Sequence, residues 1–290
     1  MNHKDAMKMI ESKSAELVKI YNQSKNKEYE FRSLTTGDQR MLAKSSASMD
    51  DYNADIIRFG LFDKMLIPGD SHMVGMSKQL ISSELTVVDM ISFMASLKLQ
   101  LGSDVEHQID CPVCDDENDI PGIGIRRLNL QTIIENCKNF ENQRCSVEMT
   151  YKDVEYKFIL GESAWFDVVI LREAIKGTAD SNAMSSMVNF AFNNTCLYIK
   201  DMFIGGEQVL TDDNKPFCKM SVPDRVSLFD NLPPMITIDD KNKESLLSIV
   251  YDKFNTKRIQ ENIFGNDPIK CPKCGAELGG VLTYDTFFTL

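Results

Sequence analysis

The sequence predicts an α+β fold with a largely helical N-terminal part, a β-containing middle and a cysteine-bearing ribbon. Apolar residues recur at helical spacing through much of residues 6–98. Residues 147–160 instead alternate apolar and polar side chains around Lys152-Asp153, which predicts a β-hairpin. Two Cys-x-x-Cys pairs, far apart in the sequence, share one flanking pattern and indicate a common site.

The N-terminal part, residues 1–104, is predicted to be a helical domain. Residues from Ala6 to about Ser24 place apolar side chains at helical spacing among Lys and Glu, which is typical of an amphipathic helix. Three more helices are predicted in this part: residues 36–43 with Thr36 as the N-cap, residues 50–62, and the apolar residues 85–98.

The rest of the chain divides into four predicted segments. They are a hairpin with the first cysteine pair (105–130), a mixed α/β region with a Gly-Gly turn at Gly205-Gly206 (131–222), a helical segment (223–266), and the second cysteine pair with a C-terminal strand (267–290). Within the helical segment, Pro223–Leu232 and Lys243–Phe254 have the helical patterns.

The cysteine pairs are the clearest chemical signal. Cys111 and Cys114, like Cys271 and Cys274, are separated by two residues, so a tight turn can direct both sulfurs to one tetrahedral ion. Each pair has an apolar residue two positions before it and a proline directly after its first cysteine. We therefore predict a zinc ribbon with one structural Zn²⁺ per chain. A redox pair and two incomplete sites are the alternatives, and neither pair has the thioredoxin-like strand-to-helix context.

The other candidate residues have simpler interpretations. His107 lies four residues before Cys111 and is an alternative ligand. Gly122 and Gly124 lack the spacing of phosphate-binding loops and are interpreted as turn residues, and Trp165 is expected in the core. Small hydrophobic or surface roles are expected for the four cysteines that lack metal-ligand spacing, Cys137, Cys145, Cys196 and Cys218.

Composition limits the classes of function. A hydrophobic content of 43% and a charged content of 26% are typical of a packed globular protein. The formal charge of −11 disfavours binding to phosphate backbones, because no strong basic cluster opposes it. No apolar run reaches the length of a membrane span, and the first residues lack the apolar core of a secretion signal. We therefore expect folding in the cytosol of the producing cell, with no membrane partner.

Several segments, in their order along the chain, resemble the baseplate hub and hub-assembly proteins of T4-type contractile-tailed bacteriophages. The similar segments are Phe31–Leu42, the predicted helix of residues 85–102 before the first Cys-Pro-x-Cys, the stretch Arg225–Pro233 with Phe229-x-x-Leu232-Pro233, and the closing Cys-Pro-Lys-Cys-Gly with Phe287-Phe288. The chain is longer than the short members of that family, and its β-rich middle region of about 145–220 is interpreted as an insertion.

The resemblance implies a non-enzymatic structural or assembly role in the tail baseplate. It implies other tail and hub proteins as partners, in the host cytoplasm during assembly and then in the virion. The alternative is a zinc-ribbon protein that binds nucleic acid or the transcription machinery, which the negative charge disfavours. A third hypothesis, an enzyme with an unrecognised site, has no support from a nucleophile elbow or a His-Glu-x-x-His motif. Oligomeric state and copy number do not follow from the sequence.

Overall fold

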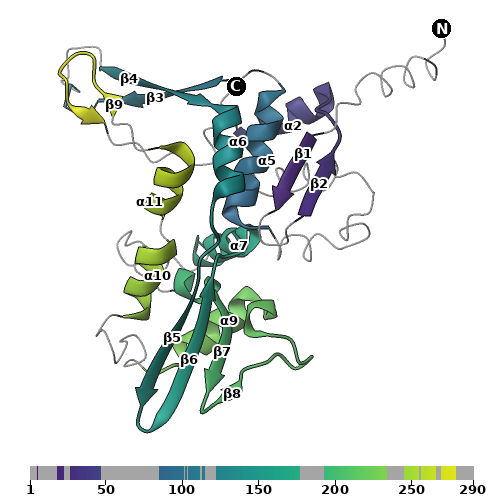
Figure 1. Cartoon of the computed structure of the whole chain (residues 1–290), viewed down its shortest axis with the longest axis vertical. Coiled ribbons are helices and arrows are strands. Elements are labelled where there is room, and N and C mark those ends of the chain that lie inside the picture. The colour runs from purple at the N-terminus through teal and green to yellow at the C-terminus, as the bar shows by residue number, and fades with distance from the viewer. Residues whose placement is uncertain are drawn as a thin grey trace. The chain divides into compact units, whose positions relative to one another are not determined.

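The computed structural model combines helices and antiparallel sheets and describes most of the chain (Figure 1). The described residues are 5, 18–22, 27–46, 85–100, 102, 104–111, 113–114, 122–176, 193–233, 245–254, 256–265 and 269–278. They form two compact units: the described parts of residues 1–74, 88–140 and 259–290 in unit 1, and those of residues 75–87 and 141–258 in unit 2. The prediction of an α+β fold is confirmed, while the predicted helices at residues 6–17 and 50–62 lie outside the described residues.

Unit 1 contains three antiparallel pairs of strands and several helices. Its elements are β1 (Val18–Asn22), β2 (Lys27–Phe31), α2 (Thr36–Ser46), α5 (Val87–Leu99), β3 (Asp104–Asp110), β4 (Ile123–Asn129), α6 (Leu130–Asn139), the π-helical η3 (Gln260–Phe264), β9 (Ile269–Lys270) and β10 (Glu277–Leu278). The short α11 (Thr256–Ile259) precedes η3. No helix of the described residues has the length and hydropathy needed to span a membrane.

The first hairpin corrects the predicted N-terminal helix. Residues 18–22 form β1 and pair with β2, with Val18 opposite Phe31, so the helix predicted as far as about Ser24 is wrong at residues 18–22. Val and Ile favour extended backbone because their β-branched side chains are restricted in a helix. The pairing with β2 therefore determines the conformation of residues 18–22, because the helical spacing of their apolar side chains is only approximate.

The start of α2 differs from the prediction by one residue. The Thr35 hydroxyl accepts from the Asp38 backbone N–H at 3.3 Å, and the Asp38 carboxylate accepts from the Thr35 N–H at 2.9 Å. Thr35 is therefore the N-cap in a reciprocal capping box, in place of the predicted Thr36. Asp38 is fully buried and also accepts from Arg32 at 2.6 and 3.1 Å.

The central helix of unit 1 is α5, as its apolar sequence predicts. Ten of its residues, from Val88 to Leu97, are buried. The Phe93 ring packs on the Phe31 ring with 5.0 Å between centroids, which joins α5 to the first hairpin. The amide of Leu34 donates to Gln100 at 2.8 Å, next to the C-terminal end of α5.

The Asp38 carboxylate should make unit 1 sensitive to acid. Burial alone would raise its pKa, but the hydrogen bonds from Arg32 and Thr35 outweigh burial and hold the pKa of Asp38 well below its usual range. Because the pKa is lower in the folded state, this stabilisation exists at neutral pH and is lost as pH falls below about 4. We expect Asp38→Asn to destabilise α2 by about 1–3 kcal/mol at pH 7. Its hydrogen-exchange protection should also depend less on pH between about 5 and 3 than in wild type. The exposed Glu135→Gln is the control, and an unchanged pH profile for Asp38→Asn would contradict the prediction.

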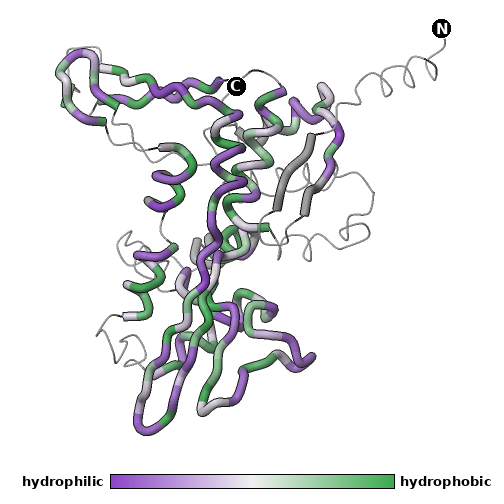
Figure 2. Tube along the Cα trace, in the orientation of Figure 1, coloured by the Kyte–Doolittle hydropathy of each residue, from purple (hydrophilic) through white to green (hydrophobic). Residues whose placement is uncertain are grey.

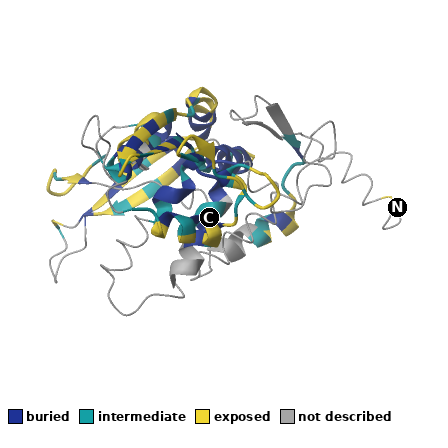
Figure 3. Ribbon diagram, turned by 90° about the horizontal axis from the view of Figure 1, so that it is seen from below, coloured by how far each residue is buried: buried dark blue, intermediate teal, exposed yellow. Residues whose placement is uncertain are grey.

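Unit 2 is an antiparallel sheet packed against helices. The strand order is β5-β6-β7-β8. Its elements are β5 (Arg144–Tyr151), β6 (Val154–Gly161), α7 (Trp165–Lys176), β7 (Ile199–Ile204), β8 (Glu207–Gln208), the 3-10 helix η1 (Phe217–Lys219), α9 (Val222–Asp230) and α10 (Leu246–Phe254). Buried and exposed residues alternate along the strands (Figure 3), so one face of the sheet packs on the core and the other meets solvent.

Both predicted hairpin turns of unit 2 are confirmed. Lys152 and Asp153 have positive φ values of 48° and 65°, and Gly205 and Gly206 have values of 60° and 85°. Two consecutive residues with positive φ are the geometry of a type I′ turn, whose twist matches that of the flanking strands. The β7 strand begins at Ile199.

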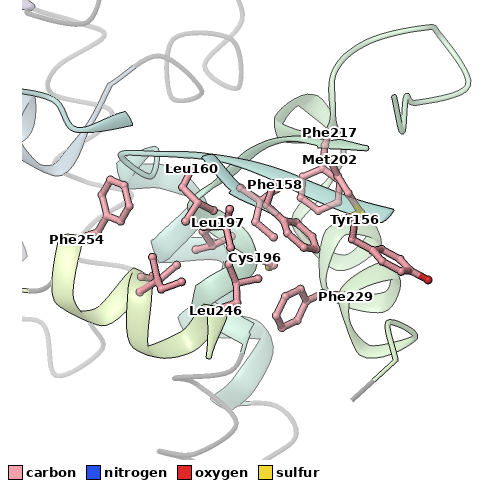
Figure 4. Packing of buried hydrophobic residues seen from close by; sticks show 14 of the residues in the cluster. Tyr156, Phe158, Leu160, Cys196, Leu197, Met202, Phe217, Phe229, Leu246 and Phe254 are labelled. Atoms are coloured by element: carbon pink, nitrogen blue, oxygen red, sulfur yellow. The ribbon is translucent and has the colours of Figure 1, made fainter. Parts of the chain in front are cut away.

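The core of unit 2 joins the inner face of the sheet to its helices (Figure 4). Phe158 and Leu160 of β6 are fully buried beside Leu246 and Phe254 of α10. Trp165 is 1% exposed, as predicted. The predicted helix Pro223–Leu232 is α9, which begins with Ser221 as its N-cap. These packed elements form the core of unit 2. The boundaries of the five segments predicted from the sequence remain predictions.

Candidate metal centre

The first cysteine turn is held at the end of the β3–β4 hairpin. The β3 strand ends at Asp110, and the Cys111 N–H donates to the Gly122 carbonyl at 2.8 Å directly beyond the ladder. The Cys114 N–H donates to the Cys111 carbonyl at 3.3 Å and closes a tight turn. This turn brings the two thiols to one side of the hairpin end, with Cys111 buried and Cys114 half-buried.

The second turn lies between β9 and β10. The Cys271 N–H donates to the Ala276 carbonyl, and the Gly275 N–H donates to the Cys271 carbonyl, both at 2.9 Å. Gly275 has φ of +74°, a conformation that residues with a side chain rarely adopt. The Lys273 N–H points at the Cys271 sulfur at 3.4 Å. Such donation from backbone to sulfur stabilises a thiolate ligand.

The four predicted cysteines meet in space. Their Sγ atoms all lie within 4.8 Å of one another. The distance is 3.6 Å between the sulfurs of Cys111 and Cys274 and 3.8 Å between those of Cys114 and Cys271. Four sulfurs at about 2.3 Å from one zinc ion lie about 3.8 Å apart at the corners of a tetrahedron. The four thiols therefore fit a tetrahedral metal ion, and all of them are outside disulfides.

Electrostatics in this group favour a bound cation. The backbone N–H groups of Cys274 and Lys273 outweigh burial and lower the pKa of the Cys271 thiol to about 6. Hydrogen bonding with the Cys274 thiol, together with burial and the other two thiols, raises the pKa of Cys114 to about 12. The Cys271 thiolate therefore forms readily, while the Cys114 thiol resists ionisation. A divalent cation removes that conflict, because its charge stabilises several thiolates at once.

Gly122 and Gly124 have a role that the sequence analysis missed. They are not turn residues: Gly122 adjoins the first cysteine turn, and Gly124 lies inside β4. A Cβ on Gly122 would lie 2.4 Å from the Cys271 sulfur, and one on Gly124 would lie 2.4 Å from Cδ1 of Leu278. The missing side chains let the second cysteine turn pack directly on the hairpin. An isolated glycine within a β-pattern is the signal that indicates such a close approach.

The chain before the second cysteine turn, at the end of η3, is also attached to the hairpin and to α6. The Arg126 guanidinium of β4 donates to the carbonyls of Phe264 and Gly265, both at 2.7 Å. Asn136 of α6 donates to the Ile263 carbonyl at 2.9 Å. These bonds fix the end of η3 against β4 and α6. No local sequence pattern predicts that Arg126 donates hydrogen bonds to backbone carbonyls so far along the chain.

His107 takes no part in the group of sulfur atoms. It pairs with Arg126 across the β3–β4 ladder and is half-buried. Burial, and then the Arg126 charge, lower its pKa. Among the described residues, the group with metal-ligand geometry consists of the four cysteines, so the prediction of His107 as an alternative ligand has no support.

The remaining cysteines lie apart from the site. Cys196 is fully buried, and its S–H donates to the Asn193 carbonyl at 2.8 Å. Burial raises the pKa of Cys196 to about 12 and also raises that of buried Cys137. Both behave as small hydrophobic residues, as predicted, whereas Cys145 and Cys218 are half-buried.

Replacement of Gly122 should weaken metal binding selectively. We expect Gly122→Ala to lower the metal affinity about tenfold or more, because the new methyl group would occupy the space of the Cys271 sulfur. Competition with a chelator measures the effect. Gly102→Ala is the matched control, since a Cβ on Gly102 has no atom within 4 Å. Equal affinities for the two variants would contradict the close approach.

The fold and the site define an α+β protein with a four-cysteine cluster that is compatible with a metal ion. No protein-family model matches the chain, and neither does any curated protein or solved structure.

Proposed function

We propose that the chain is a non-enzymatic structural or assembly component of the baseplate hub of a contractile phage tail, acting through protein contacts and stabilised by one structural Zn²⁺. The observation that carries the structural role of the metal is the group of four thiols at Cys111, Cys114, Cys271 and Cys274. Four thiolates fill a tetrahedral coordination sphere, so no position is left for a water or a substrate. Zinc is the proposed ion because thiolate ligands in tetrahedral geometry favour it.

The ordered sequence resemblance supports the baseplate part of the proposal. Two of its segments are well-formed elements: the first spans the Arg32–Asp38 ion pair and the start of α2, and another spans α9 with buried Arg225 and Phe229. The net charge of −11 is compatible with specific protein contacts and disfavours nonspecific nucleic-acid binding.

Analysis of purified contractile-tailed particles from the phage that encodes the chain tests the proposal. Mass spectrometry should detect the chain at a fixed low copy number, and metal analysis of the recombinant chain should give about one zinc. Absence from finished particles, combined with capture of tail proteins from assembling cells, would identify an assembly factor within the same proposal.

Capture of nucleic acid or polymerase in place of tail proteins would overturn the proposal. That result would favour the zinc-ribbon nucleic-acid-binding alternative, for which we would expect an affinity that falls steeply with salt. Zinc content alone does not separate the two functions, because both use a closed metal site. The captured partner is the discriminating observation.

A further inference from the structure

The β3–β4 hairpin has two faces of different character. Gly124 lies on the face that packs against Leu278 and the second cysteine turn. On the opposite face Ile123 and Ile125 are 39% and 53% exposed. Figure 2 shows hydrophobic and hydrophilic residues along both strands of this hairpin. Two large apolar side chains of one strand therefore point to solvent on the face away from the cysteines.

Exposed apolar residues concentrate at this hairpin. Among the described residues, five large apolar side chains are highly exposed, and three of them belong to β4 and the first cysteine turn, where Val113 is 67% exposed. The other two, Leu210 and Tyr251, are single residues of unit 2. Scattered exposed apolar residues need no explanation, but a group on one hairpin and its adjoining turn indicates a contact surface.

The β3 side of the same face is acidic. Asp110 pairs with Ile123, and Glu106 pairs with Arg127, so these side chains share the solvent face. Arg127 forms an ion pair with Glu106 at 2.9 Å. Asp110 has no hydrogen bond or ion pair with another described side chain. The apolar surface is therefore bordered by an acidic charge that its own hairpin does not neutralise.

We propose that the solvent face of the β3–β4 hairpin, formed by Ile123, Ile125 and their acidic β3 neighbours, binds an amphipathic, positively charged segment of a protein partner. Apolar side chains of the segment cover the two isoleucines, and its basic groups pair with Asp110. A second copy of the chain fits less well, because each copy carries a charge of −11 and neither offers, on this face of the hairpin, the basic groups that would pair with Asp110 of the other without breaking the Arg127–Glu106 ion pair. The inference rests on the proposed function, in which the chain works through protein contacts.

Titration of the zinc-loaded full chain with two labelled synthetic helical peptides tests the surface. Both carry the same leucine face, one with lysines and the other with glutamates on its polar face, and fluorescence anisotropy reports binding. We expect the basic peptide to bind at least tenfold more tightly than the acidic one. Ile123→Ser/Ile125→Ser should weaken binding of the basic peptide at least tenfold, while the control Leu210→Ser/Tyr251→Ser leaves it unchanged.

A charge-matched comparison separates the surface from general electrostatics. Asp110→Asn should weaken the basic peptide several-fold, whereas the exposed Asp153→Asn in unit 2 should not. Equal binding of both peptides, or equal loss in test and control variants, would overturn the proposal. So would self-association in sedimentation that the isoleucine substitutions abolish, which would identify a second copy as the occupant. The zinc content of each sample is also measured. If a variant loses peptide binding but retains zinc, the loss is due to the hairpin surface and not to the metal site. Absence of zinc from the wild-type protein would refute the proposed metal site.

Discussion

Replacement of Cys271 by serine should remove about one zinc ion per chain and make the protein indifferent to chelators. Cys271 is 2% exposed, and its sulfur accepts from the Lys273 N–H; backbone hydrogen bonds lower its pKa to about 6, so its thiolate is well stabilised. A serine hydroxyl stays protonated at neutral pH and is a poor zinc ligand. Structural zinc in small metal-binding units stabilises the folded state by about 10–16 kcal/mol at pH 7. The second cysteine turn should therefore detach from the hairpin in Cys271→Ser.

Metal analysis and hydrogen exchange of residues 269–278 measure this effect. Cys145→Ser is the matched control, because Cys145 is a half-buried thiol of β5 outside the site. Wild-type protein treated with a strong chelator should reproduce the exchange pattern of Cys271→Ser. An unchanged zinc content in Cys271→Ser would refute four-thiolate coordination, and fast exchange in all samples would show that the metal does not order the turn.

The composition of this site was predictable, but its construction was not. Two Cys-x-x-Cys pairs with matching flanks identify the ligands without reference to their separation, and the structure brings Cys114 and Cys271, 157 positions apart, to 3.8 Å. The contacts that hold the cysteine turns in place could not be predicted in the same way. The bonds of Arg126 to the end of η3 and the contact of Gly122 with a sulfur depend on tertiary placement, which no local pattern encodes.

The same distinction applies to the fold. Helix α5 was predictable because ten buried residues require an apolar run, and the β5–β6 hairpin because its alternation is regular over both strands. The β1 strand was missed because its few residues have no clear period and only the pairing with β2 makes them extended. Local sequence patterns do not predict short strands or helices whose conformation depends on the element they pair with.

The burial of Arg225 is a further feature that local reasoning did not find, and it leads to a large expected effect. Its side chain is 1% exposed and contacts the Asp167 carboxylate at 2.7 Å. Its Nε and Nη1 atoms are buried without a hydrogen-bond partner. Arg225→Met would remove the ion-pair partner of the Asp167 carboxylate, which is 17% exposed. We expect a loss of about 3 kcal/mol in the free energy of unfolding of unit 2.

Fluorescence of Trp165, the only tryptophan, reports this unfolding in denaturant, because Trp165 is buried at the start of the same helix as Asp167. Lys157→Met is the control: the Lys157–Glu148 pair is 45% and 53% exposed and should contribute less than about 1 kcal/mol.

The double variant Arg225→Met/Asp167→Leu distinguishes an uncompensated charge from lost packing. Replacing both partners of a buried ion pair by apolar residues removes the desolvation cost together with the attraction, and this is often neutral or stabilising. The unsatisfied nitrogens of Arg225 add to that cost in the wild type. We therefore expect the double variant to regain most of the stability lost in Arg225→Met. A double variant as unstable as the single one would show that the arginine stabilises α9 through its shape and contacts, and that the ion pair with Asp167 contributes little.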